Sequence, residues 1–142
     1  MKRIVISALS VILAVSMLLC LAACAEQGGS GDLWDSAVYH EDTELGTGAK
    51  TVTVEVKVED HSVTFTVHTD KDTVGAALLE HELIDGDEGE YGMYVKKVNG
   101  ILADYDVDKS YWAFYINGEY AMTGIDVTDI DADALYQLAY TK

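Results

Sequence analysis

The residues that could perform chemistry are few, and their spacing does not match known catalytic motifs. Catalysis needs an activated nucleophile, a bound metal ion or a matched acid and base. His81 and Glu82 begin like the helix of a zinc protease, but position 85 is Asp instead of the second histidine of H-E-x-x-H. No serine lies in a G-x-S-x-G turn. We therefore expect a protein that is not an enzyme.

Acidic residues cluster at two places that bear on metal binding. Three alternate aspartates begin like an EF-hand calcium loop: Asp129, Asp131 and Asp133. The motif then fails, because position 134 is Ala instead of Gly and position 140 is Tyr instead of Glu. The segment 85–90 could hold a calcium ion weakly, and a solvated acidic loop is the alternative that we favour. Histidines 40, 61 and 68 have no partner at metal-ligand spacing, so we expect no metal cofactor.

Aromatic residues are concentrated between Tyr91 and Tyr120. The stretch contains Tyr91, Tyr94, Tyr105, Tyr111, Trp112, Phe114, Tyr115 and Tyr120. On a strand over 111–116, Trp112 and Phe114 face the core, whereas Tyr115 faces the opposite side. Outward rings suit a surface that contacts a large, partly apolar ligand or another protein. Tyrosine is also a common strand former on solvated faces, so propensity alone leaves both interpretations open.

The N-terminus has the organisation of a secretory signal. Lys2 and Arg3 precede an apolar run over 4–19, which is shorter than the roughly 20 residues of a bilayer-spanning helix. Residues 21–24, Leu-Ala-Ala-Cys, resemble the bacterial lipobox, in which the chain is cut before the cysteine and lipid is attached to its sulfur. The resemblance implies lipidation of Cys24 and a firm anchor on the extracytoplasmic face of the cell membrane. The alternative is an ordinary signal peptide with an incidental cysteine.

The charge of the chain excludes one class of partner. The formal net charge is −16, and cleavage before Cys24 removes Lys2 and Arg3 and takes it to −18. Proteins bind nucleic acid by neutralising its phosphates with Lys and Arg, so we expect no nucleic-acid partner. The acidity is consistent with solubility and with repulsion from anionic surfaces.

The composition divides the chain into three segments. We expect a signal peptide over 1–23, a flexible tether over 24–48, and one domain over 49–142. The Gly-rich tract at 28–31 and the lack of periodicity after it are typical of a linker. Trp34 and Tyr39 interrupt this tether and could pack onto the domain or a partner, with stray linker aromatics as the alternative.

Hydrophobic periodicity predicts the elements of the domain. Strict alternation over 51–58 and 63–67 predicts an antiparallel hairpin. Val74, Ala77, Leu78 and His81 share one helical face, and Asp72 or Thr73 can cap that helix. Further strands are expected over 93–98, 111–116 and 135–140, with a loop over 85–90 and a tight turn at 117–118. The predicted fold is α+β: a β-grasp-like (ubiquitin-like) mixed sheet with one helix packed across it.

Three motifs in the second half of the chain resemble a known family. They are Gly92-Met93-Tyr94-Val95, Tyr111-Trp112-Ala113-Phe114 and Gly124-Ile125-Asp126. In this order they resemble the C-terminal domain of intrinsic factor and transcobalamin. Small bacterial lipoproteins with a Trp-x-Tyr-x-x-Asn-Gly-Glu signature look closer still, as Trp112, Phe114 and residues 117–119 show. The resemblance covers 51–140, with motif-level strength from Tyr91 onward.

The resemblance implies a capping surface for a corrinoid. It places ligand contacts at Tyr94, Trp112 and Phe114, and on the hairpin loop that contains Tyr120 and Met122. The alternation of the strand over 111–116 adds Tyr115 as an outward candidate. The carriers close this domain over a helical barrel that these 142 residues do not include. Residues 124–127 also lack the Ala-Asp-Tyr that the carriers have in this segment.

Two classes of function follow from the sequence. The leading hypothesis is a surface-displayed, non-enzymatic module that captures a corrinoid (cobalamin) and delivers it to a membrane uptake transporter that completes the pocket. The alternative is a protein or glycan interaction module that uses the same aromatic face without a small-molecule ligand. Likeness of fold alone does not decide between them.

Overall fold

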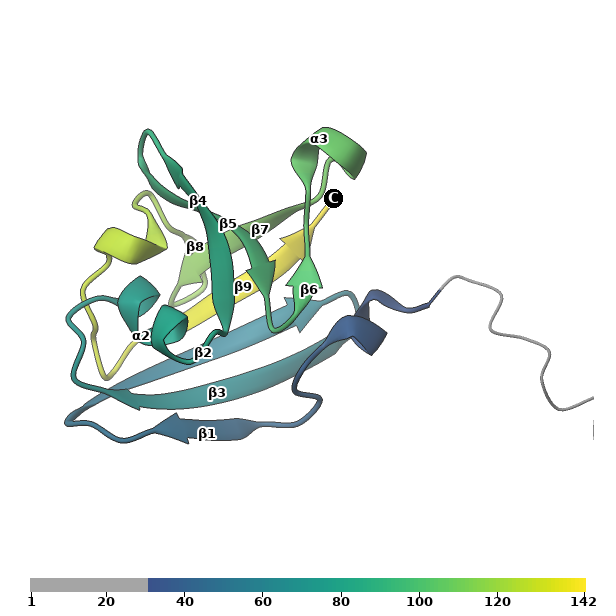
Figure 1. Cartoon of the computed structure of the whole chain (residues 1–142). Helices are drawn as coiled ribbons and strands as arrows, with labels where there is room; N and C mark the ends of the chain where they lie inside the picture. Colours follow the sequence, from purple (N-terminus) through teal and green to yellow (C-terminus); the bar gives the residue numbers. More distant parts are fainter. Residues whose placement is uncertain (1–30) are drawn as a thin grey trace, which may run out of the picture. The chain divides into compact units, whose positions relative to one another are not determined.

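The computed structural model describes residues 31–142 (Figure 1). The elements in chain order are η2 (Leu33–Ser36), β1 (Thr43–Gly46), β2 (Lys50–Val58), β3 (His61–Thr69), α2 (Val74–Glu80), β4 (Ile84–Gly89), β5 (Gly92–Val98), β6 (Ile101–Leu102), α3 (Tyr105–Asp108), β7 (Tyr111–Ile116), β8 (Glu119–Tyr120), η3 (Ile125–Val127) and β9 (Leu135–Thr141). Strands with few helices confirm the α+β class. The predicted signal peptide and Cys24 lie outside the described residues.

The larger sheet has the strand order β1-β3-β2-β9-β7-β8. β2 and β3 form the predicted antiparallel hairpin, while β2 pairs with β9 in parallel and β9 pairs with β7 in antiparallel register. The inward residues are fully buried because strict alternation sends them all to one face: Val52, Val54, Val56, Val58, Val63, Phe65 and Val67. Asn117 and Gly118 have φ of 52° and 83°, which confirms the predicted tight turn between β7 and β8.

A second sheet has the order β4-β5-β6, and it corrects one prediction. The segment 85–90 was expected to be a solvated acidic loop, but its residues up to Gly89 belong to β4, which pairs with β5. A bulge interrupts the register between Asp85 and Gly86. The acidic side chains remain exposed while the backbone pairs, so their polarity gives no sign of the strand. Gly86 allows β4 to lie close to β5 at the bulge, because a Cβ at this position would collide with the Tyr94 carbonyl.

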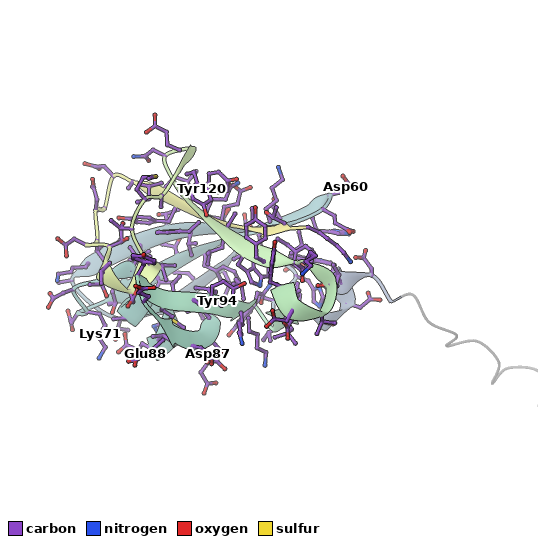
Figure 2. The ribbon with its side chains drawn as sticks, turned by 90° about the horizontal axis from the view of Figure 1, so that it is seen from above. Asp60, Lys71, Asp87, Glu88, Tyr94 and Tyr120 are labelled. Atoms are coloured by element: carbon purple, nitrogen blue, oxygen red, sulfur yellow. The ribbon has the colours of Figure 1, made fainter. Side chains whose placement is uncertain are left out.

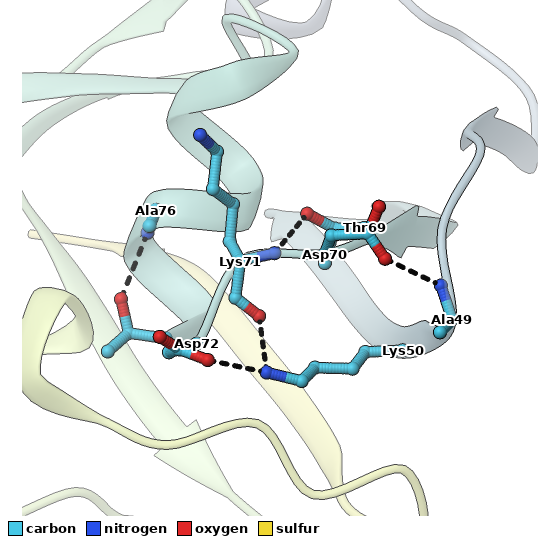
Figure 3. A network of polar contacts seen from close by, with 8 residues as sticks. Ala49, Lys50, Thr69, Asp70, Lys71, Asp72 and Ala76 are labelled. Carbon is cyan, nitrogen blue, oxygen red and sulfur yellow. Dashed lines mark hydrogen bonds and ion pairs between the residues drawn. The ribbon is translucent and has the colours of Figure 1, made fainter.

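Helix α2 packs beside the larger sheet, and a polar network holds its first turn (Figure 3). Thr73 is the cap, since its side chain accepts a hydrogen bond from the Ala76 amide at 3.3 Å. Asp72 instead pairs with Lys50 Nζ at 2.6 Å, and the same ammonium donates to the Lys71 carbonyl at 3.0 Å. The hydrogen bond and the charge of Lys50 lower the pKa of Asp72. Above the ordinary pKa of aspartate, this ion pair therefore stabilises the folded state. The stabilisation is lost as the pH falls through the lowered pKa of Asp72.

The predicted tether is wrong for residues 31–48. β1 adds a parallel strand beside β3, and Ala37 is buried in the core. The Asn99 side chain accepts a hydrogen bond from the Tyr39 amide at 2.9 Å and donates one to the Tyr39 carbonyl at 2.8 Å. Trp34 stacks on His61 with ring centroids 5.1 Å apart. The strand has only four residues and gains its partner from distant sequence, so no local periodicity reveals it.

We predict that a fragment covering 49–142 is less stable than one covering 31–142. The shorter fragment loses β1 and the packing of Ala37 and Tyr39, and it leaves the buried Asn99 amide without partners. The expected loss is ~3 kcal/mol or more, as for the removal of a large apolar side chain together with a buried polar contact. Urea unfolding of both fragments, followed by circular dichroism, measures the difference. Equal midpoints would show that residues 31–48 contribute no stability.

Candidate functional site

The predicted aromatic residues converge on one pocket between the two sheets. It has a volume of about 170 Å³, and we call it the aromatic pocket. One wall is β5, a second is β7, and a third is the loop from β8 to η3. The residues used below are Tyr94 of β5, Trp112 and Phe114 of β7, Tyr120 of β8, and Ala121 and Gly124 of the loop. These strands are distant in sequence, so the pocket exists only in the folded chain.

Four of the six predicted ligand contacts line the aromatic pocket: Tyr94, Trp112, Phe114 and Tyr120. Tyr94 and Tyr120 are labelled in Figure 2 and come from different sheets. Their exposed fractions are 41% and 59%. Tyr115 does not line the pocket, because alternation turns it to the other face of β7. Tyr115 pairs with Tyr120 across β7 and β8, and the two rings meet with centroids 5.6 Å apart and planes at 89°. The Tyr120 ring therefore lies on the same outer face as Tyr115, at the rim of the pocket. Met122 is 93% exposed on the loop and does not line the pocket either.

Trp112 and Phe114 serve both the core and the pocket. Trp112 is 7% exposed and meets Tyr140 edge to face at 5.6 Å, whereas Phe114 stacks on the buried ring of Tyr136 at 6.1 Å. The prediction that both face the core is confirmed. Trp112 Nε1 is buried and has no hydrogen-bond partner among the described residues. Such an unpaired donor costs free energy, so the indole is held here by its ring packing.

Asp126 joins two walls of the aromatic pocket. Its Oδ1 accepts a hydrogen bond from the Met93 amide of β5 at 2.8 Å. Glycines on both sides leave room for the carboxylate, because a Cβ at Gly92 would lie 2.6 Å from Oδ1 and one at Gly124 would lie 2.7 Å from it. Sequence reasoning noted the Gly-Ile-Asp motif but missed this role. Met93, which donates the hydrogen bond, lies 33 residues before Asp126 in the chain. The glycine two residues before Asp126 was the local signal available in the sequence.

The aromatic pocket differs in charge from the larger hollows of the described domain. Its lining within residues 31–142 contains no charged side chain. A hollow of about 520 Å³ is lined by Glu82, Asp85 and Lys97 among others. A third, of about 280 Å³, includes Lys96, whose pKa is raised by the hydrogen bond and charge of Asp87. The aromatic pocket is thus the hollow suited to an apolar, uncharged group.

Within residues 31–142, no three His, Cys, Asp or Glu side chains are grouped so that they could hold a metal ion. His81 was predicted on the helix face, but α2 ends at Glu80 and His81 is its C-cap. Its Nε2 is buried 4.0 Å from Glu80 Oε2. In the same part of the chain, no helix has the length and apolar character needed to cross a membrane.

Comparisons with known proteins show similarity of sequence and of fold. Residues 71–135 match the family described as a domain of unknown function (DUF4430). No curated protein matches the chain. A crystal structure of a protein from Ruminococcus gnavus ATCC 29149, described as a candidate metal-binding protein, is 29% identical with a TM-score of 0.61. That match covers 66% of this chain and 98% of the other.

The second similar structure is haptocorrin in complex with Cbi. It is 15% identical with a TM-score of 0.52, and the match covers 69% of this chain but only 26% of haptocorrin. At this identity the likeness concerns the fold alone. The chain therefore corresponds to about a quarter of haptocorrin's length.

Proposed function

We propose that this protein is a non-enzymatic binding module that captures a corrinoid, such as cobalamin, at the aromatic pocket. The observation that supports this most is the convergence of Tyr94, Trp112, Phe114 and Tyr120 from three strands on one uncharged hollow. Amphipathic rings with exposed faces are the residues that anchor large, partly apolar ligands. The resemblance of fold to haptocorrin, whose structure is a complex with Cbi, agrees with this proposal.

We also infer a β-grasp topology. The first hairpin, β2 and β3, leads into helix α2, and the last strand, β9, pairs in parallel with β2 at the centre of the sheet. β7 then flanks β9 on the far side from β2. The sequence predicted a β-grasp-like mixed sheet with one helix packed across it, and this strand order supports that proposal.

The size of the aromatic pocket indicates how a corrinoid would bind. Pockets that surround a drug-sized ligand have about 300–1,000 Å³, whereas this one has about 170 Å³. The domain would therefore cover one face of the macrocycle and leave the other open. A second protein, which we propose is a membrane uptake transporter, would close the open face.

Titration of residues 31–142 with cobalamin and cobinamide tests this function. We expect saturable quenching of tryptophan fluorescence, because Trp112 lies in the pocket wall. Equilibrium dialysis, followed by the visible absorbance of the corrinoid, provides an independent measurement. A chelator should change neither the binding nor the melting temperature. Absence of binding at near-millimolar corrinoid would rule out capture by this domain alone.

The position of the module is a separate proposal. We propose that Cys24 carries the lipid and holds the domain on the extracytoplasmic face of the cell membrane, because the lipobox-like segment 21–24 ends there. Cys24→Ala should leave the precursor uncleaved or release the protein from the membrane fraction. Cys20→Ala is the matched control and should change neither fractionation nor mature mass. Unchanged mass and fractionation of Cys24→Ala would contradict the proposal.

The exposed rim of the aromatic pocket favours a second candidate function. Tyr94 and Tyr120 of the pocket lining are exposed, as are Met122, which follows Ala121 in the chain, and Tyr91, whose carbonyl lies beside Gly124. Exposed aromatic and Met side chains are also characteristic of protein interfaces. A protein or glycan interaction module would use this rim without a corrinoid. The corrinoid titration separates the two candidates, because only the first predicts binding.

A further inference from the structure

The volume of the aromatic pocket limits what can enter it. A cavity of about 150 Å³ lined by apolar side chains is large enough to bind one benzene molecule. The aromatic pocket has about 170 Å³, which leaves room for one ring and little more. A corrin macrocycle is several times larger and must therefore lie outside it. The pocket is a subsite for a small part of the ligand.

The lining of the pocket indicates the chemistry of that part. Trp112 and Phe114 on the inward face of β7 supply aromatic rings to the pocket, and a planar ring can meet them stacked or edge to face. No charged side chain within the described residues lines the pocket, and the net charge of the chain is −16. An anionic ring would lose hydration without gaining a partner and would be repelled by the protein. A neutral ring avoids both costs, and a cationic ring would gain attraction from the aromatic faces.

We propose that the aromatic pocket is a single-ring subsite that admits one planar, neutral or cationic ring and rejects an anionic ring of the same size. This inference rests on the proposed function, because it takes the aromatic pocket to be the binding site. We take the ring to belong to the captured small ligand, and an aromatic side chain of a protein is the alternative source. Both sources present the same chemistry to the pocket, and the experiment below distinguishes them.

Three probes with the same ring test the charge selectivity: benzyl alcohol, benzylammonium and benzoate. Each is titrated at millimolar concentration into residues 31–142 and followed by the NMR shifts of backbone amides. The neutral and cationic probes should shift Met93, Ala121 and Gly124 in a saturable manner, and benzoate should not. Equal shifts with benzoate, or no saturable shifts with any probe, would overturn the inference.

A plugged variant tests the location. Ala121 lines the pocket, and Ala121→Phe places a new ring inside it without removing any existing aromatic residue. Val107→Phe adds the same ring at an 80% exposed position outside the lining and serves as the matched control. Ala121→Phe should abolish probe binding while the protein stays folded by circular dichroism, and Val107→Phe should bind as the wild type does. Retained binding in folded Ala121→Phe would place the ring elsewhere. If Ala121→Phe does not fold, Ala121→Leu gives the same test with a smaller plug.

The corrinoid titration separates failure of this inference from failure of the proposed function. If corrinoids bind and Ala121→Phe leaves their affinity unchanged, the single-ring subsite is wrong and corrinoid capture stands. If benzyl alcohol binds but corrinoids do not, the subsite stands and corrinoid capture is wrong. In that case, a tryptophan-containing peptide that competes with benzyl alcohol identifies a protein side chain as the source of the ring. Displacement of benzyl alcohol by cobalamin instead identifies a small ligand.

Discussion

Trp112→Ala should lower the free energy of unfolding by ~3 to 5 kcal/mol, the usual cost of truncating a buried aromatic side chain. The indole is 7% exposed, belongs to the core cluster and meets Tyr140 edge to face. Alanine would leave a cavity next to the aromatic pocket that surrounding strands cannot close. Small domains have about 5 to 15 kcal/mol of stability, so the melting temperature should fall by well over 10 °C. Urea unfolding and thermal melts followed by circular dichroism measure both changes.

Two control variants identify the source of this loss. Trp112→Phe keeps an aromatic ring and removes a buried N–H that has no partner among the described residues, so it should cost much less than alanine. Tyr115→Ala acts on the opposite face of β7 and should barely affect folding, because this face lies away from the core cluster. A melt of Trp112→Ala that matches the wild type would contradict the core role of the residue.

Tyr120→Ala should weaken corrinoid binding by ~2 kcal/mol, or roughly thirtyfold, which is typical of an aromatic hot spot. The Tyr120 ring is 59% exposed at the rim of the aromatic pocket and packs on Tyr115, so it is available to a ligand and contributes little to the core. Stability should change by less than about 1 kcal/mol, because exposed substitutions seldom do more. Equilibrium dialysis gives the affinity, and a thermal melt of the same sample gives the stability.

The control for this variant is Tyr105→Ala, which removes a tyrosine of similar exposure outside the pocket lining. It should bind corrinoid as the wild type does. Phe114→Ala should weaken both binding and stability, because the ring lines the pocket and stacks on Tyr136. Tyr115→Ala should reduce affinity only slightly, through its edge contact with Tyr120. Equal affinities of Tyr120→Ala and Tyr105→Ala would remove the aromatic pocket from corrinoid binding.

Short-range patterns in the sequence determined the elements with strong local signals. Alternation over 51–58 and 63–67 predicted the central hairpin, and the helical spacing from Val74 predicted α2 with its cap at Thr73. The turn at Asn117 and Gly118 followed from residues that tolerate positive φ. In each case the residues that form the element also contain its sequence pattern, so the element could be predicted without knowledge of distant contacts.

The tertiary structure alone decided which distant segments meet. β1 and β4 have weak local signals, and each is a strand because a partner strand satisfies its backbone hydrogen bonds. Tyr39 is held by Asn99, which lies 60 residues away. In β4, backbone pairing with β5 outweighs the low strand propensity of Gly and Asp.

The sequence also determined the aromatic character of the candidate site, but not its shape. Tyr94, Trp112, Phe114 and Tyr120 could be named from motifs, and alternation along β7 correctly separated the face of Tyr115 from that of Phe114. The pocket itself arises where β5 of one sheet approaches β7 of the other, and Asp126 joins β5 to the loop that forms its third wall. Its volume depends on the distance between strands that are not neighbours in the chain. Only the packed fold determines that distance, and with it the size of the ligand group that the pocket can admit.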